Sequence, residues 1–243
     1  MVPDDVLQQA LEMHHAGDLR EAERLYSTIL EREPGNSDAL HLLGVISYQK
    51  RDYAFAEKCY RRALQVNPAY YQAYSNLGIL LVHIGKPEEA IQCYERALQL
   101  HPHDPGILNN LGLAHAARGN LDAALSLYRE AICLKPDYAE AYNNLGNALR
   151  GLGKTDSAIR SFEYAVHFKP EYAEGYNNLA NALAEKAEVE EAISLYHTAL
   201  QYNGRYISAL NNLGKISREE QQLDAGGGVV TVDALLGFGV ALV

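Results

Sequence analysis

The sequence predicts an all-α fold, a superhelical solenoid of antiparallel helix pairs, and three observations predict it. A dipeptide ending in proline recurs every 34 residues. Within each repeat the apolar positions are spaced by three and four residues, as on one face of an α-helix. Two positions of the resulting register keep one kind of residue throughout. Such a short repeat cannot bury its apolar face alone, so neighbouring repeats must stack.

The recurrent prolines define the repeats. They lie at repeat position 32 and are Pro34, Pro68, Pro102, Pro136 and Pro170, with Gly204 in the next slot. The repeats are therefore 3–36, 37–70, 71–104, 105–138, 139–172 and 173–206. A proline disfavours helical geometry at the residue before it, so each proline is expected to end the second helix of its repeat.

Positions that do not define the register agree with it. Position 20 is alanine in all six repeats, and position 8 is always glycine or alanine. Position 24 is aromatic: Tyr26, Tyr60, Tyr94, Tyr128, Phe162 and Tyr196. We expect the small residues to let the two helices of a repeat approach closely. The aromatic rings are expected to fill the volume between one helix pair and the next.

Each repeat is read as two helices in the same order. The first carries apolar positions 4, 7, 8 and 11, and the second carries 20, 21, 24, 27 and 28. Between them, glycine at position 15 suits a left-handed cap at the end of the first helix. These glycines are Gly17, Gly85, Gly119 and Gly153. Pro87 begins a second helix at a point where its missing N–H costs little.

A final first helix is expected over 207–223, covering the last apolar face of a solenoid that spans 1–224. Residues 225–243 then leave the pattern, since position 20 would be Gly226 and position 27 Asp233. This tail has one charge and is slightly short for a membrane span, which disfavours a membrane anchor. We expect either the product of a truncated longer reading frame or a segment that docks on the last helix. Left exposed, it would promote aggregation.

Composition restricts the partners. The 21 basic and 31 acidic residues give a net charge of −10, which disfavours binding to nucleic acid or anionic lipid. The N-terminus lacks the basic start and apolar run of a secretory signal. Three cysteines without CxxC spacing do not suggest disulfides or structural zinc. We therefore expect a cytoplasmic protein with reduced thiols, of which Cys59 and Cys93 should be buried or half-buried.

Enzymatic and metal-binding functions find little support. His14 and His15 are adjacent on a helix and point to different faces, and the set of His101, His103 and Asp104 lies in a turn between repeats. None of the motifs GxGxxG, GxxxxGK[ST], GxSxG or HExxH is present. We expect no catalytic activity, no cofactor and no bound metal.

The repeat columns resemble the tetratricopeptide repeat over residues 3 to about 223. The resemblance implies a right-handed superhelix whose first helices line a concave surface through positions 2, 5, 6, 9, 12 and 13. It also implies that the protein is a non-enzymatic scaffold for protein–protein interaction.

Asparagine recurs at the positions that this resemblance places on the concave surface. Position 6 carries Asn76, Asn110, Asn144, Asn178 and Asn212, and position 9 adds Asn147 and Asn181. Position 5 adds Asn109, Asn143, Asn177 and Asn211. An amide both donates and accepts hydrogen bonds, so such a ladder can hold the backbone of an extended peptide. The alternative is that these asparagines order neighbouring helices.

Segments 141–146 (AYNNLG) and 176–183 (YNNLANAL) are most similar to the repeat region of O-linked N-acetylglucosamine transferases, where an asparagine ladder holds substrate polypeptide. The chain could thus be the substrate-recruiting portion of such an enzyme, without its catalytic region. The family's clamp for chaperone C-termini, which adds Lys and Arg to Asn, is disfavoured because only Arg150 and Lys215 are cations on this face. Self-assembly, giving a homo-oligomer, is a third alternative.

Position 9 is apolar in the earlier repeats, with Val45, Ile79 and Leu113. This strip could anchor an apolar part of a ligand. Alternatively, it packs on the chain's own N-terminal helices.

Overall fold

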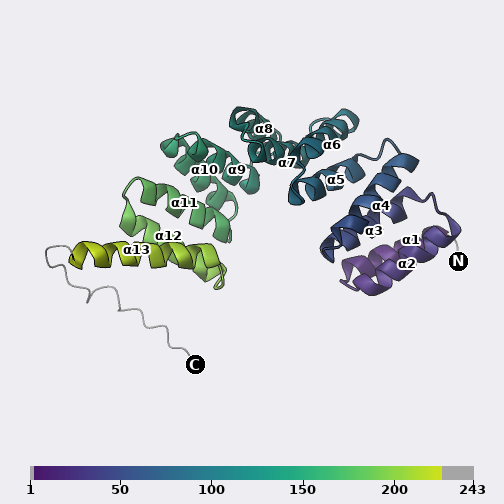
Figure 1. The fold of residues 1–243 in the computed structure, drawn as a ribbon, viewed down its shortest axis with the longest axis horizontal. Helices are drawn as coiled ribbons and strands as arrows, with labels where there is room; N and C mark the ends of the chain where they lie inside the picture. Colours follow the sequence, from purple (N-terminus) through teal and green to yellow (C-terminus); the bar gives the residue numbers. More distant parts are fainter. Residues whose placement is uncertain (1–2, 226–243) are drawn as a thin grey trace, which may run out of the picture. The chain divides into compact units, whose positions relative to one another are not determined.

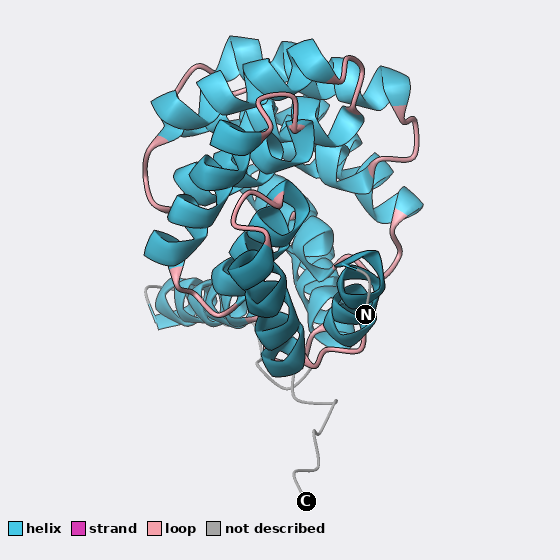
Figure 2. Cartoon of the chain, turned by 90° about the vertical axis from the view of Figure 1, so that its right-hand side faces the viewer, coloured by secondary structure: helices cyan, strands magenta, loops and turns pink. Residues whose placement is uncertain are grey.

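A computed structural model of the chain describes residues 3–225, and within that range it contains thirteen α-helices and no strand (Figures 1 and 2). The helices are α1 (Pro3–His15), α2 (Leu19–Arg32), α3 (Ser37–Gln49), α4 (Tyr53–Val66), α5 (Tyr71–His83), α6 (Pro87–Leu100), α7 (Pro105–Ala117), α8 (Leu121–Leu134), α9 (Ala139–Gly151), α10 (Thr155–Phe168), α11 (Ala173–Glu185), α12 (Val189–Tyr202) and α13 (Ile207–Ala225). The all-α fold class is confirmed. No helix in this range is both long and apolar enough to span a bilayer. The expectations for the tail lie outside the described residues, apart from Ala225.

The chain divides into two compact bodies, 1–161 and 162–243, which we call the N-terminal and C-terminal bodies. In the N-terminal body, α1 packs on α2, α3 on α4, α5 on α6 and α7 on α8. In the C-terminal body, α11 packs on α12. Each of these pairs is the first and second helix of one repeat.

The second helices end where the prolines predict. The residue before each proline leaves helical geometry, as at Glu33 (φ −129°, ψ 78°) and Asn67 (φ −124°, ψ 90°). Asn203, which precedes Gly204, adopts the same extended geometry (φ −143°, ψ 90°). Proline is therefore not required for this turn.

The turns inside the repeats use left-handed backbone at position 15. Gly17, Gly85, Gly119 and Gly153 have φ between 72° and 82°, as expected for these caps. Arg51 and Ala187 occupy the same position with φ 63°, although they carry side chains. The turn geometry is thus imposed by the repeat rather than by glycine alone.

The aromatic rings at position 24 pack against position 8 of their own repeat. A Cβ atom added to Gly112 would lie 2.5 Å from a ring carbon of Tyr128, and one added to Gly78 would lie 2.6 Å from Tyr94. The sequence predicts that these rings lie between one helix pair and the next. The structure adds that glycine at position 8 makes room for the ring within the same pair.

This contact predicts opposite effects for two glycine substitutions. Gly112→Ala should lower the free energy of unfolding by about 1–3 kcal/mol, because its Cβ overlaps the Tyr128 ring. Gly214→Ala, at position 8 of α13, has nothing within 4 Å of the added Cβ. It should raise the stability by roughly 0.5–1 kcal/mol through the better helix propensity of alanine. Urea titrations of the two variants measure both effects, and equal effects would contradict the packing.

The first helices of successive repeats lie close together. In the N-terminal body α3 contacts α5, α5 contacts α7 and α7 contacts α9, and in the C-terminal body α11 contacts α13. The second helices α2, α4, α6 and α8 make no comparable contact with one another. Figure 1 shows α3, α5 and α7 on the inner side of α4, α6 and α8. The first helices therefore line the inner face of the N-terminal body.

Candidate functional site

The position 6 asparagines of the N-terminal body lie half-buried on the first helices of its repeats. Asn144 donates from Nδ2 to Oδ1 of Asn109 on the preceding first helix, at 2.9 Å. Asn76 donates in the same way to Nε2 of His41, at 2.8 Å. Each of these hydrogen bonds joins position 6 of one repeat to position 5 of the repeat before it. They fix the orientation of the amide and link neighbouring repeats.

Position 5 is the buried side of this arrangement. Asn109 is 4% exposed and Asn143 is fully buried. The expectation that position 5 adds to the ligand-binding surface is therefore wrong for these two residues. The Asn109 side chain accepts from Asn144 on the adjacent first helix, and an unpaired amide in such a buried place would be costly. Asn109 therefore supports a position 6 amide instead.

Asn110 differs from its neighbours in the same row. The residue at position 5 of the preceding repeat is Ser75, and no hydrogen bond joins it to Asn110 in the described part of the chain. Asn110 and Asn147 are both half-buried, and neither has a hydrogen-bond partner among residues 3–225. These two amides keep their full capacity to donate and accept.

His41 replaces asparagine at position 5 of the second repeat and forms a different network. Its Nδ1 lies 3.2 Å from the hydroxyl of Tyr70. Because Asn76 donates to Nε2, the neutral ring carries its proton on Nδ1. Burial lowers the pKa of His41 to about 4, although the Asp38 charge acts in the opposite direction. His41 is thus neutral at physiological pH.

The C-terminal body builds a denser amide network from three helices. Asn212 on α13 donates from Nδ2 to Oδ1 of Asn177 at 3.1 Å and to Oδ1 of Asn181 at 2.8 Å. The hydroxyl of Tyr196 on α12 also donates to Oδ1 of Asn181, at 2.7 Å. Asn178 is buried, and its Oδ1 accepts from Asn177 at 3.3 Å. Among the predicted site residues of this body, Asn181 and Asn212 therefore meet, and Asn178 is buried.

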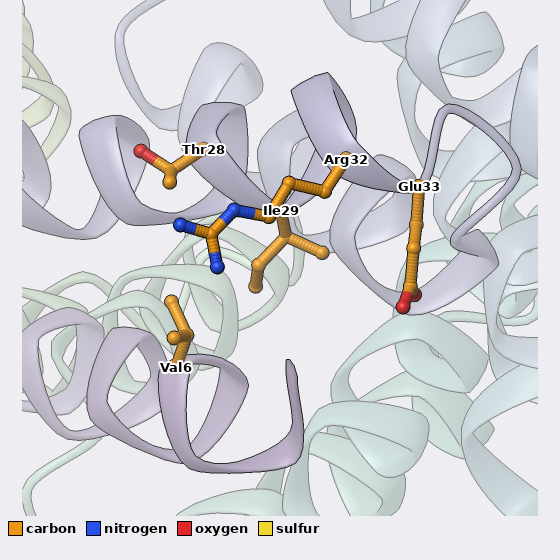
Figure 3. A pocket seen from close by; sticks show the side chains of 5 residues that line it. All are labelled: Val6, Thr28, Ile29, Arg32 and Glu33. Carbon is orange, nitrogen blue, oxygen red and sulfur yellow. The ribbon is translucent and has the colours of Figure 1, made fainter. Parts of the chain in front are cut away.

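Two pockets in the described part of the chain differ in volume and therefore in the ligand group that they can hold. The larger, of about 300 Å³, lies in the C-terminal body and is lined by Asn181, Ala184, Glu185, Tyr196, Asn212, Lys215 and Ile216. The smaller lies between α1 and α2, where Val6, Ile29 and Arg32 approach one another (Figure 3). Its volume is about 10 Å³, which is no more than one water molecule needs. Of these two, the larger is the one that can receive a ligand group.

The apolar side chains at position 9 are partly covered by packing within the protein. Val45 and Ile79 are half-buried and pack on the core formed by α4, α5, α6 and α7. The strip therefore packs on neighbouring repeats rather than on α1 and α2. Leu113 is the exposed member of the strip.

The thiols and histidines give no sign of a reactive centre in the described range. Cys59 is buried and Cys93 half-buried, as expected, and burial raises the pKa of each to about 11. Cys133 is exposed. Residues 3–225 contain no group of three or more His, Cys, Asp or Glu side chains placed to hold a metal ion.

Comparison with known proteins places these features in context. A family described as "Tetratricopeptide repeat" matches residues 15–56, 48–105, 76–139, 109–173 and 143–209. No curated protein sequence matches the chain.

Several solved structures are similar in fold. The crystal structure of MamA is 26% identical, with a TM-score of 0.58, over 67% of this chain and 95% of MamA. PilW, described as a widely conserved type IV pilus biogenesis factor, is 20% identical with a TM-score of 0.79, over 88% of this chain and 98% of PilW. YrrB, described as a TPR protein with an unusual peptide-binding site, is 20% identical with a TM-score of 0.57, over 78% of this chain and 97% of YrrB.

Proposed function

Because the chain belongs to the tetratricopeptide repeat family, whose members generally mediate protein–protein interaction, we propose that it is a scaffold that binds an extended polypeptide. The observation that carries this proposal is the pair of half-buried amides Asn110 and Asn147 on first helices of the N-terminal body, since neither side chain has a hydrogen-bond partner within residues 3–225. An amide of this kind can donate to a peptide carbonyl and accept from a peptide N–H.

The paired position 6 asparagines would contribute differently. Asn76 and Asn144 each commit one N–H to the preceding repeat, so each keeps its oxygen and its second N–H for a ligand. Their orientation is fixed before binding, which lowers the entropy lost when a ligand binds. The peptide-binding site attributed to the similarly folded YrrB agrees with this use of the fold.

The resemblance of the asparagine segments to O-linked N-acetylglucosamine transferases supports a narrower form of the proposal. In that form the chain recruits substrate polypeptide for a glycosyltransferase whose catalytic region is not in these 243 residues. Both forms of the proposal assign polypeptide binding to the inner face of the N-terminal body and to the same asparagines.

Substitution of the unpaired amides tests the binding site. Peptides would be selected on the full chain from a random library, and their dissociation constants measured by fluorescence anisotropy. The double variant Asn110→Ala and Asn147→Ala should weaken binding by about tenfold, since each lost hydrogen bond is worth about 0.5–1.5 kcal/mol. Its thermal stability should not change, because neither side chain has a partner in the described structure.

Two controls accompany this variant. Gln92→Ala removes an exposed amide from the second helix α6 and should leave the affinity unchanged. Asn144→Ala should lower the stability by about 1 kcal/mol, because it leaves the buried Asn109 without its donor. Selected peptides that bind the double variant as tightly as the wild type would refute the proposed site.

We also infer a second candidate function, self-assembly, from the apolar surface of α13. Ile207 is 70% exposed and Leu210 is 49% exposed. Leu210→Glu should shift any oligomer toward monomer in light scattering at increasing protein concentration. Leu134→Glu, which changes an exposed leucine on α8, is the control and should have no effect. An oligomer that survives Leu210→Glu would exclude this face.

A further inference from the structure

The hollow of the C-terminal body has a donor and an acceptor that are fixed by their surroundings. Asn181 on α11 uses its oxygen to accept from both Tyr196 and Asn212. An amide oxygen has two lone pairs, so only the Nδ2 donors of Asn181 are left for a ligand. Asn212 uses its nitrogen to donate to Asn177 and Asn181. It therefore offers its oxygen.

The remaining walls favour a neutral group on a short apolar stem. Glu185 and Lys215 bring opposite charges to the lining, so a carboxylate or an ammonium group in the ligand would be attracted by one of them and repelled by the other. Ala184 and Ile216 supply the apolar lining. The hollow lies between α11, α12 and α13 and reaches the Tyr196 side chain, which is itself buried. A side chain can enter such a space more readily than a main chain can.

We infer that this hollow is a subsite for the side-chain carboxamide of a glutamine or asparagine in the bound polypeptide. The carboxamide oxygen accepts from Asn181 Nδ2, and its N–H donates to Asn212 Oδ1. A primary amide satisfies a fixed donor and a fixed acceptor together through two separate atoms, since its oxygen accepts while its N–H donates. This inference rests on the proposed polypeptide-binding function and adds a preference for one kind of side chain.

Small capped amino acids test the subsite on the full chain. The probes are N-acetylglutamine N-methylamide and its norleucine and glutamate counterparts, which share the same two peptide groups. Nuclear magnetic resonance would follow the side-chain amide signals of Asn181 and Asn212 during titration. The glutamine probe should shift both signals and bind about tenfold more tightly than norleucine, because it adds two hydrogen bonds. Glutamate should bind more weakly than glutamine, because a carboxylate has no N–H to donate to the acceptor on Asn212.

Tyr196→Phe tests whether the amide orientation is the cause. It removes the hydroxyl that occupies the Asn181 oxygen. The Asn181 amide can then present either its oxygen or its nitrogen to the ligand. The ratio of the affinities for the glutamine and norleucine probes should therefore fall. Tyr128→Phe, the same change in the N-terminal body, should leave the preference intact. Asn212→Ala removes the acceptor without altering Tyr196 and should abolish the preference, which keeps the test valid if Tyr196→Phe disturbs the fold.

Equal affinities for the glutamine and norleucine probes, or unshifted Asn181 and Asn212 signals, would overturn the subsite. That result would leave the proposed function standing, since the Asn110 and Asn147 variant tests peptide binding in the other body. Conversely, glutamine binding at Asn181 together with unchanged peptide affinity in the Asn110 and Asn147 variant would refute the ladder and retain the subsite.

Discussion

Tyr128→Ala is expected to lower the free energy of unfolding by about 3–5 kcal/mol, the cost of removing a fully packed aromatic side chain. Tyr128 is 1% exposed, and its ring fills the space above Gly112 that other residue types would close. Burial also raises the pKa of its hydroxyl well above the usual value. Urea unfolding followed by circular dichroism measures the loss.

A matched substitution and a double variant check the cause. Tyr128→Phe should change the stability by less than about 1 kcal/mol, because the hydroxyl has no hydrogen-bond partner in the described residues. In the double variant with Gly112→Ala, the added methyl group occupies part of the space left by the ring. The double variant should therefore lose less stability than the sum of the losses in the two single variants, by about 0.5–3 kcal/mol. Strict additivity would show that the ring and Gly112 do not share this contact.

Acidification is expected to destabilise the N-terminal body through His41. Its pKa is about 4 in the folded protein and 6.5 in the unfolded chain. Below pH 6.5 the unfolded chain takes up a proton that the folded protein refuses, so stability falls as the pH drops from 6.5 toward 4. The full difference corresponds to about 3 kcal/mol. Above pH 6.5 the contribution of His41 is constant.

His41→Asn is the variant that isolates this effect, because asparagine occupies position 5 in later repeats such as those of Asn109 and Asn143. The introduced amide could accept from Asn76 as Asn109 accepts from Asn144. The variant should stay folded and lose most of the pH dependence between 6.5 and 4. Thermal melts at a series of pH values compare it with the wild type. Parallel curves for the two proteins would exclude His41 as the source.

Helix pairing was predictable from the sequence because it depends on spacing alone. The prolines mark the ends of the second helices, and Glu33 and Asn67 leave helical geometry where the prolines require it. Left-handed turns were predictable at the four glycines of position 15. They were not predictable at Arg51 and Ala187, since only the register of the repeat identifies these residues as turn positions.

The candidate site was predictable only in part. The pattern identified the asparagines, but Asn109 and Asn110 are neighbours in sequence and differ in environment. The first is buried against the adjacent helix, and the second is half-buried. Helical spacing places both near the inner face and cannot separate them, because the angle between successive first helices decides which one faces the neighbour. The hollow around Asn181 was not predicted, since it requires side chains from three helices at once.

The missing link between Ser75 and Asn110 has a mechanical consequence. Bending a stack of repeats away from its inner face moves successive first helices apart. Between α3 and α5 this motion must break the bond from Asn76 to His41, and between α7 and α9 the bond from Asn144 to Asn109. Between α5 and α7 no such bond resists it in the described structure. At the level of Asn110 the described residues of the N-terminal body are therefore held by the non-directional apolar packing of α5 on α7, which belong to one core, and not by an amide cross-link.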